Sequence, residues 1–144
     1  EEFGRTKGGI KNSYCCSSEV NKLDWSRAWK NHGLVDYYRG LIGLRMQMPG
    51  IQDKSPNAHQ RVLWMKELAK DCVMACVDNK GVGSKWQQIL MIFNCSNHSG
   101  YAQLPAGNWQ VLADGENSFR WQKHDTVEHK INVPEFSAMI LGLK

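Results

Sequence analysis

Acidic side chains near the start of the sequence are the first candidates for chemistry. Glu1, Glu2, Glu19, Asp24 and Asp36 all lie within the first quarter of the chain. Two carboxylates held roughly 5–9.5 Å apart can act together on a glycosidic bond. Spacing along the chain does not select a pair, and acids are far more often solvated or helix-capping groups. The solvated or capping interpretation is therefore favoured, and we assign no catalytic residue.

Signatures of other nucleophiles, phosphate loops and metal sites are incomplete. No serine or cysteine stands in the sharp strand-turn-helix setting of an activated nucleophile. The glycines at 8–9 and 81–83 do not complete a phosphate-cradling loop, and turn roles suit them better. Five cysteines and five histidines form no four-ligand zinc cluster, and no acidic loop has calcium spacing. We expect no metal site and no cofactor.

The cysteines also bear on the redox compartment. Cys15 and Cys16 are adjacent, so a disulfide between them would be strained, and an odd total favours reduced thiols. Cys72 and Cys76 have an even spacing that puts both on one face of a strand, where we expect them to be buried. Unpaired thiols slightly favour a cytoplasmic location, and a secreted parent protein stays open.

Charge and hydropathy limit the partners. The net charge is +4, but lysine and arginine are scattered among acids and never form a run of five, so nucleic-acid binding is disfavoured. No stretch approaches the roughly 18 apolar residues that cross a bilayer. The first eleven residues lack the features of a signal peptide, which leaves export undecided. We predict neither a nucleic-acid partner nor a membrane partner.

Six tryptophans support a carbohydrate-binding hypothesis, because flat sugar faces stack on exposed aromatic rings. Four of them, Trp64, Trp86, Trp109 and Trp121, fall after residue 60 among short apolar runs. Tryptophans at strand positions are more often part of the core. Core packing is the favoured interpretation for each of these four.

The elements that must position these side chains begin with a polar loop. Residues 1–33 are rich in glycine, asparagine and serine, and neither a strand nor a helix period occurs before Asn31. Such a long irregular run indicates either function or a missing neighbour. A helix of about 15 residues should follow, with Asn31 as N-cap, Arg45 in the last turn and Pro49 ending it. Its apolar stripe consists of Leu34, Tyr38, Leu41, Ile42 and Met48.

The remainder of the chain has the pattern of short strands. Residues 51–60 form a polar linker, and runs rich in β-branched and aromatic residues follow, separated by turn signals. We predict strands near 61–65, 72–78, 87–94, 101–104, 109–113, 127–133 and 137–141. The predicted fold class is mainly β: an antiparallel two-sheet β-sandwich of about seven strands, preceded by one α-helix and a long N-terminal loop.

A family resemblance becomes visible in the first 45 residues. The segments EEFGRTK (1–7), NSY (12–14) and EVNKLDW (19–25) closely resemble, in order and spacing, the segment after the eighth barrel strand of type I pullulanases. VDYYRGLIGLR (35–45) resembles the final barrel helix of the same α-amylase-superfamily enzymes. Residues 89–94, 104–109, 114–115 and 133–141 are more loosely similar to their C-terminal β-sandwich.

This resemblance implies a parent enzyme that hydrolyses α-1,6 linkages in pullulan, starch or glycogen with retention of configuration. It assigns residues 1–50 to the end of the catalytic (β/α)₈ barrel and residues 51–144 to the C-terminal sandwich, so we expect a non-catalytic C-terminal fragment. The catalytic carboxylates belong to earlier barrel strands, and this chain by itself should hydrolyse nothing. The expected partners are α-glucan through the parent enzyme and the barrel within the same protein, with self-association of the isolated fragment.

Barrel enzymes bind substrate with the loops that follow their strands. The resemblance therefore makes the polar residues of the first loop candidates for sugar contact: Arg5, Lys7, Asn12, Tyr14, Asn21 and Asp24. A structural alternative is an ion pair between Arg5 and Asp24, with Tyr14 or Trp25 as apolar anchors. The sequence departs from the family at Ser18, where an acidic residue is common, and at Cys15 and Cys16. A stand-alone carbohydrate-binding β-sandwich module is the alternative function.

Overall fold

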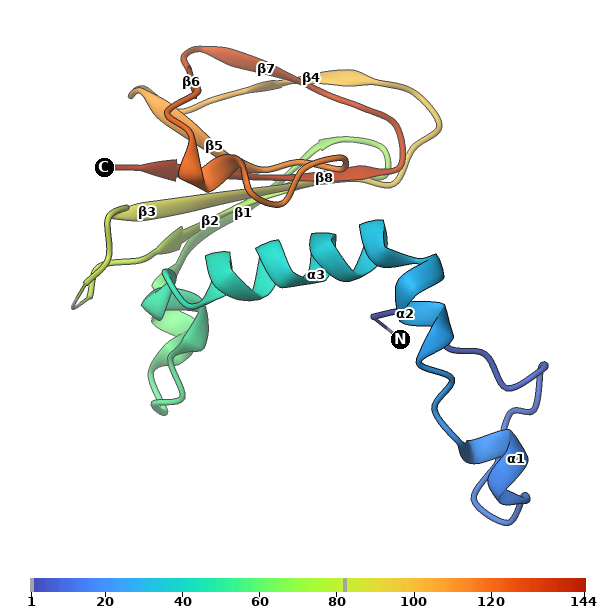
Figure 1. The fold of residues 1–144 in the computed structure, drawn as a ribbon. Coiled ribbons are helices and arrows are strands. Elements are labelled where there is room, and N and C mark those ends of the chain that lie inside the picture. Colours follow the sequence, from blue (N-terminus) through green and yellow to red (C-terminus); the bar gives the residue numbers. More distant parts are fainter. Residues whose placement is uncertain (1, 82) are drawn as a thin grey trace. The chain divides into compact units, whose positions relative to one another are not determined.

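The computed structural model describes residues 2–81 and 83–144 and divides the chain into two compact units, residues 1–39 and 40–144 (Figure 1). Glu1, one of the acidic candidates, and Val82 of the glycine-rich turn lie outside the described residues. In the described part of the chain, no helix is both long and apolar enough to span a membrane.

The first unit contains two short helices where the sequence predicted only loop. These are α1 (Ser18–Asn21) and α2 (Ser26–Lys30). The Asp24 carboxylate accepts hydrogen bonds from the backbone N–H and the hydroxyl of Ser26, the first residue of α2, at 3.1 and 2.6 Å. The prediction was wrong here because helices of four or five residues are too short to show a full helical period.

The predicted longer helix is present as α3 (His32–Arg45), with Arg45 in its last turn. Asn31 is the residue immediately before α3, and its backbone carbonyl accepts from the N–H groups of Leu34 and Val35, as an N-cap position requires. Its side-chain amide donates to Phe3 O at 2.7 Å. The stripe is only partly buried: Leu34, Tyr38 and Ile42 are exposed. The buried side chains at the end of this segment are Leu44 and Met48.

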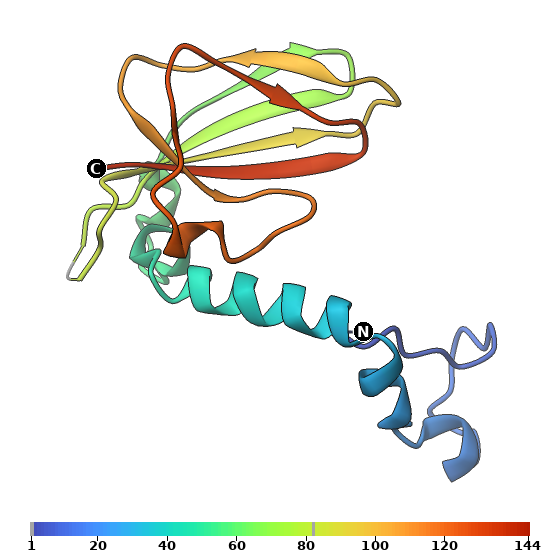
Figure 2. The same ribbon diagram turned by 45° about the horizontal axis from the view of Figure 1, so that its top comes forward.

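The second unit contains eight antiparallel strands in two sheets, which confirms the predicted mainly β sandwich (Figures 1 and 2). One sheet has the order β1-β2-β3-β8-β5-β6, and the other pairs β4 with β7. Three 3₁₀ helices lie between elements: Pro49–Gln52, Ala58–Arg61 and Arg120–Gln122. The strands are β1 Val62–Ala69, β2 Cys72–Asp78, β3 Gln88–Asn94, β4 Gly100–Gln103, β5 Trp109–Ala113, β6 Thr126–Val127, β7 Lys130–Val133 and β8 Ser137–Leu143.

One predicted strand, 127–133, is divided into β6 and β7. His129 lies between them with φ of 62°, a left-handed conformation that interrupts an extended strand. The two resulting strands join different sheets: β6 pairs with β5, whereas β7 pairs with β4. The chain therefore passes from one layer of the sandwich to the other at His129.

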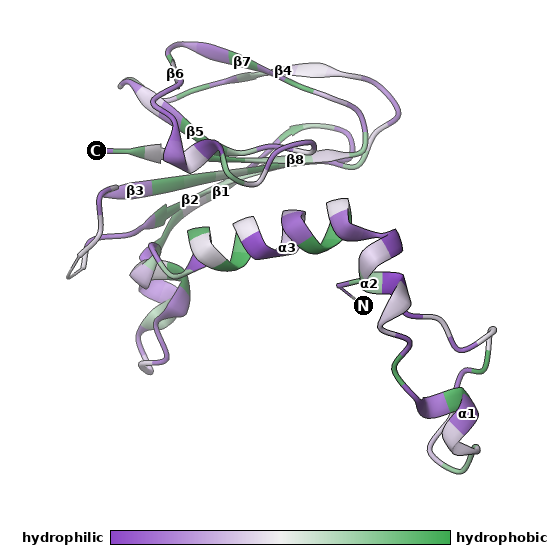
Figure 3. Cartoon of the chain, in the orientation of Figure 1, coloured by the Kyte–Doolittle hydropathy of each residue, from purple (hydrophilic) through white to green (hydrophobic). Residues whose placement is uncertain are grey.

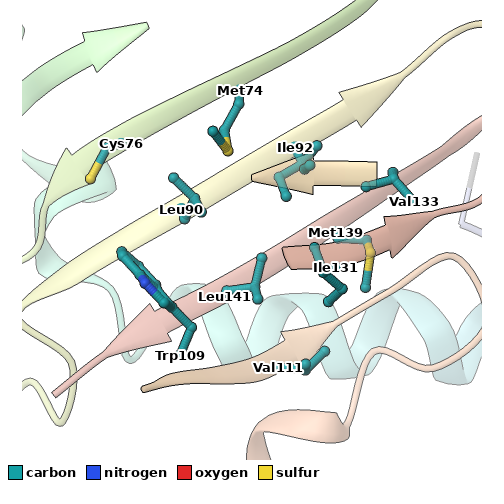
Figure 4. Close-up of a cluster of buried hydrophobic side chains, with 11 residues drawn as sticks. Met74, Cys76, Leu90, Ile92, Trp109, Val111, Ile131, Val133, Met139 and Leu141 are labelled. Atoms are coloured by element: carbon teal, nitrogen blue, oxygen red, sulfur yellow. The ribbon is translucent and has the colours of Figure 1, made fainter. Parts of the chain in front are cut away.

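A first apolar core lies between the two sheets (Figure 4). Ile131 and Val133 from β7 point toward side chains of β2, β3, β5 and β8, among them Leu90 and Leu141. Cys76 and Cys72 lie on the same face, as their even spacing predicted, but only Cys76 is buried, whereas Cys72 is partly buried against this core. Burial raises the pKa of both thiols. All five cysteines are unpaired.

A second apolar core covers part of the opposite face of the six-stranded sheet. Leu44 at the end of α3 and Met48 pack with Trp86, Ile89 and Leu112. Because β3 contributes Leu90 and Ile92 to the first core and Ile89 to the second, its sequence is apolar almost throughout, and Figure 3 colours much of it as hydrophobic. Two covered faces thus explain why this strand lacks a clear alternation.

Candidate functional site

Three of the six predicted sugar-contact residues meet in one hydrogen-bond network within residues 5–21. The Asn21 amide donates to Ser13 O at 2.8 Å and to Cys16 O at 3.2 Å, and it accepts from the Ser13 hydroxyl at 2.9 Å. Arg5 Nη2 donates to Asn21 O at 2.7 Å, and Lys7 Nζ donates to the Ser13 hydroxyl. These contacts close the loop on itself without an apolar core.

The other three predicted residues stand outside this network. Asn12 accepts a hydrogen bond from the Tyr14 backbone at 3.4 Å, and the Tyr14 ring is exposed. Asp24 binds Ser26 at the start of α2, and the hydrogen bond from the Ser26 hydroxyl lowers the pKa of its carboxyl group. Within the described residues no ion pair joins Arg5 to Asp24, so the predicted ion pair between these two side chains is wrong.

The predicted residues fall into two groups: some hold the loop in shape, and others are exposed to solvent. Asn21 and Arg5 direct their polar groups inward at other parts of the loop, whereas Asn12 and Tyr14 are exposed. An exposed phenol ring beside an exposed amide offers an apolar face and hydrogen-bonding groups to a sugar. No cluster of three side chains able to hold a metal ion occurs in residues 2–81 and 83–144. Sugar contact by the six residues stays a prediction.

Two tryptophans of the first unit, Trp25 and Trp29, are exposed, although neither was predicted from the sequence as a candidate binding residue. Trp29 is 84% exposed, and Trp25 is also exposed while its ring lies 5.6 Å from that of Phe3. The two tryptophans are four residues apart, a spacing that places side chains on one helical face and could have revealed them. They border an open hollow of about 490 Å³, which is lined by Trp25, Ala28, Trp29, His32, Val35, Asp36 and Arg39.

Tryptophans of the second unit serve mainly in packing, as the favoured interpretation held. Trp109 is fully buried and donates from its indole N–H to Pro105 O at 2.9 Å. Trp86 is buried in the second core and donates to the Gln110 side chain at 3.0 Å. Trp64 and Trp121 are partly buried against the two cores. Hydrogen-bonded indoles in the interior are held rigidly and cannot stack on a sugar.

Comparisons with known proteins agree on one family. Residues 60–117 match the model of the pullulanase all-beta domain. The chain is 33% identical over 105 residues to a pullulanase of Bacillus subtilis. This match covers 73% of the chain and 15% of the pullulanase. It is 29% identical over 126 residues to a glycogen debranching enzyme of Pectobacterium carotovorum, which covers 77% of the chain and 17% of that protein.

Solved structures extend the likeness to nearly the whole chain. The match to a pullulanase from Bacillus acidopullulyticus covers 98% of this chain and 17% of the pullulanase chain, with a TM-score of 0.83 and 29% identity. A type I pullulanase from Bacillus subtilis complexed with maltose matches 99% of this chain and 20% of its own, with a TM-score of 0.81 and 26% identity. The chain thus spans less than a quarter of these relatives. It is pullulanase-like, with residues 60–117 similar to the all-β domain of pullulanases, and it corresponds to a portion of larger debranching enzymes.

Proposed function

We propose that this chain is the non-catalytic C-terminal part of a debranching enzyme. In this proposal the full-length protein hydrolyses α-1,6-glucosidic linkages in pullulan, starch or glycogen with retention. Residues 1–50 complete its barrel, and residues 51–144 form the sandwich that packs on the barrel and stabilises it. The names pullulanase and glycogen debranching enzyme among the relatives support the activity of the parent.

The observation that carries the packing role is an apolar surface on the six-stranded sheet, on the side away from the first core. Strand register aligns Met65 of β1 with Ala75 of β2, and Val73 of β2 with Phe93 of β3. Met65 is 69% exposed, and Phe93 and Leu63 are exposed as well. We call these five residues the outer strip: Leu63, Met65, Val73, Ala75 and Phe93.

The outer strip continues the surface that the second core covers only in part. Ala75 pairs with Met91, and Met91 packs against the core formed by Leu44 and Met48. A contiguous exposed apolar surface typically marks a protein contact. The strip also includes β1, an edge strand of its sheet, and exposed apolar edge strands favour association. We therefore assign the strip to contact with the barrel of the parent enzyme.

A reducing-sugar assay on pullulan tests the assignment of catalysis. Retaining hydrolysis needs a carboxylate nucleophile and a carboxyl acid/base on either side of the bond, and the proposal places both in the rest of the parent. The purified 144-residue chain should release no reducing ends above the buffer level. Turnover that co-purifies with the chain and follows its concentration would refute the proposal.

A chimaera tests the packing role. The chain replaces the matched C-terminal portion of the Bacillus subtilis pullulanase, and thermal unfolding is measured for the chimaera and for the isolated chain. Met65→Lys should lower the unfolding temperature of the chimaera, because it buries a charge at the contact, and leave that of the isolated chain nearly unchanged. It should also reduce any self-association of the isolated chain in sedimentation velocity.

The matched control is Gln103→Lys, which adds the same charge at an exposed position of β4 in the other sheet. This control should affect the chimaera and the isolated chain equally little. If Met65→Lys and Gln103→Lys behave alike in the chimaera, the outer strip does not contact the barrel.

A further inference from the structure

Three chain connections meet at one end of the sandwich, on the right in Figure 1. They are the β1–β2 turn at 70–71, the β3–β4 loop at 95–99 and the β7–β8 turn at 134–136. The Cys95 N–H donates to Asp71 O at 2.8 Å, and the Phe136 N–H donates to Ser96 O at 3.1 Å. These bonds fix the three connections to one another.

Two adjoining hollows open at this end. One of about 290 Å³ is bordered by Tyr101, and one of about 450 Å³ is bordered by Phe136. Lys70, Ser96 and His98 line both hollows, so the two form one continuous depression. The shared residues are polar, and each hollow is lined by one of two aromatic residues, Tyr101 or Phe136.

Both aromatic rings are available to a ligand. Tyr101 is 69% exposed and Phe136 is 73% exposed. Tyr101 projects outward from β4 because the next residue, Ala102, faces the first core. Lys130 Nζ lies 5.0 Å from the centroid of the Tyr101 ring and steadies it by a cation–π contact.

Phe136 occupies a backbone conformation that its side chain does not favour. Its φ is 45°, in the left-handed region where glycine or asparagine is the usual residue. Packing does not explain the choice of phenylalanine, because the ring is exposed rather than buried. Strained positions that display a side chain to solvent are enriched at binding sites. The ring itself is therefore the reason to retain phenylalanine at this turn.

A buried asparagine holds the depression in shape. Asn94 donates to His98 O at 2.9 Å and to Pro134 O at 2.9 Å, and its carbonyl oxygen accepts from the Ser96 backbone at 3.0 Å and hydroxyl at 2.7 Å. Its side chain thereby joins the β3–β4 loop to the β7–β8 turn. A site whose supports are locked by hydrogen bonds is preorganised for a ligand. Asn94 is a positioning residue in this arrangement.

We propose that this end of the sandwich binds a short linear α-glucan. The apolar faces of two glucose units stack on Tyr101 and Phe136, and the hydroxyl groups between them bind Lys70 and His98. A protein partner would favour a continuous apolar surface, whereas here charged and polar groups separate the two rings. The ligand class rests on the proposed function, while the site is additional to it and lies on the sandwich.

Nuclear magnetic resonance of the ¹⁵N-labelled chain tests the proposal directly. Maltoheptaose is titrated to millimolar concentration, with cellohexaose as the β-linked control. We expect saturable shifts of the amides of 96–101 and 134–137 with maltoheptaose and weaker shifts with cellohexaose. The absence of shifts, or shifts confined to the region of Trp25 and Trp29, would overturn the proposal.

Variants separate binding from folding. Tyr101→Ala should weaken maltoheptaose binding about tenfold, since an aromatic contact contributes roughly that factor. Phe136→Gly should weaken binding similarly but leave the unfolding midpoint unchanged or higher, because glycine relieves the left-handed strain. Phe93→Ala, which removes an exposed ring from the other face of the sheet, is the control and should leave binding unchanged. Equal affinity for all four proteins would refute the site.

The outcome is independent of the tests of the proposed function. The pullulan assay and the Met65→Lys chimaera do not involve this end of the sandwich. Loss of the glucan site therefore leaves the packing proposal intact, and failure of the chimaera leaves the binding measurements interpretable.

Discussion

Each of the two units of the chain is stabilised internally by a different kind of interaction. In residues 2–39 the one buried residue is Ser13, and hydrogen bonds from Arg5, Asn21, Arg27 and Asn31 to backbone carbonyls tie the segment together. In residues 40–144 two apolar cores bury strand and helix side chains. Apolar burial dominates the free energy of folding, whereas a solvent-accessible hydrogen bond contributes little net. The comparison teaches that apolar burial stabilises the second unit, whereas local hydrogen bonds hold the first.

The largest effect should come from the first core. Leu90→Ala removes a fully buried side chain at the centre of β3 and should lower the free energy of unfolding by about 3 kcal/mol. Urea denaturation monitored by tryptophan fluorescence measures the change. Phe93→Ala on the same strand is the control, with a much smaller loss because Phe93 is exposed. Equal losses would mean that the core does not hold the second unit.

The same glycine substitution should have opposite signs in the two units. A β-carbon on Gly50 would lie 2.2 Å from Asp78 O, so Gly50→Ala should destabilise the second unit by about 2 kcal/mol. A β-carbon on Gly33, in the first turn of α3, meets nothing within 4 Å. Gly33→Ala should therefore stabilise that helix by about 0.5–1 kcal/mol. Thermal unfolding and amide exchange measure the two changes in stability. If both substitutions stabilised or both destabilised the protein, the predicted difference between the two units would be wrong.

Loss of the Asn21 network should be felt only locally. Asn21→Ala removes the hydrogen bonds to Ser13 and Cys16 and should lower the local opening free energy by about 1 kcal/mol. Amide exchange should accelerate within residues 13–21 and stay unchanged within β3. Faster exchange in β3 would show that the first unit stabilises the sandwich.

The smallest expected effect is a loss of stability at acidic pH, through the carboxylate of Asp53. The hydrogen bond from Arg61 is the main cause that lowers the pKa of Asp53 to about 2, from an ordinary value near 4. Because the folded pKa is the lower one, the carboxylate stabilises the fold above about pH 4, and this contribution is lost as the pH falls toward 2. Asp53→Asn should be less stable than the parent chain at pH 5 and converge with it near pH 2, in urea denaturation at each pH. Arg61→Gln should give the same convergence; a gap that is constant with pH would contradict the assignment.

Local sequence patterns predicted the sandwich well and the first unit poorly. The strands 72–78 and 109–113 have the predicted bounds, because turn residues on both sides delimit apolar runs. The short helices α1 and α2 were missed, and the bond from the Asn31 side chain to Phe3 O was not predicted. A polar residue can serve several local partners, and spacing alone does not say which one it takes.

The candidate sites show the same limit. The family resemblance implied sugar contact by the polar residues between Arg5 and Asp24, but it did not distinguish Asn21, which binds inward, from Tyr14, which is exposed. Nothing in the sequence joined Tyr101 with Phe136, because their proximity to shared residues depends on how β4 and β7 meet β3 and β8.

The sequence by itself determined the fold class and most strand positions, since these follow from composition and from patterns within about ten residues. The pullulanase-like resemblance rested separately on the segments 1–7, 12–14, 19–25 and 35–45. Only the tertiary structure decided the strand order, the change of layer at His129, the choice of Leu44 and Met48 as the buried end of the helical segment, and the burial of Trp86 and Trp109. Burial is a property of contacts between residues far apart in the chain. Strand pairing is likewise decided by which partners together bury the most apolar surface.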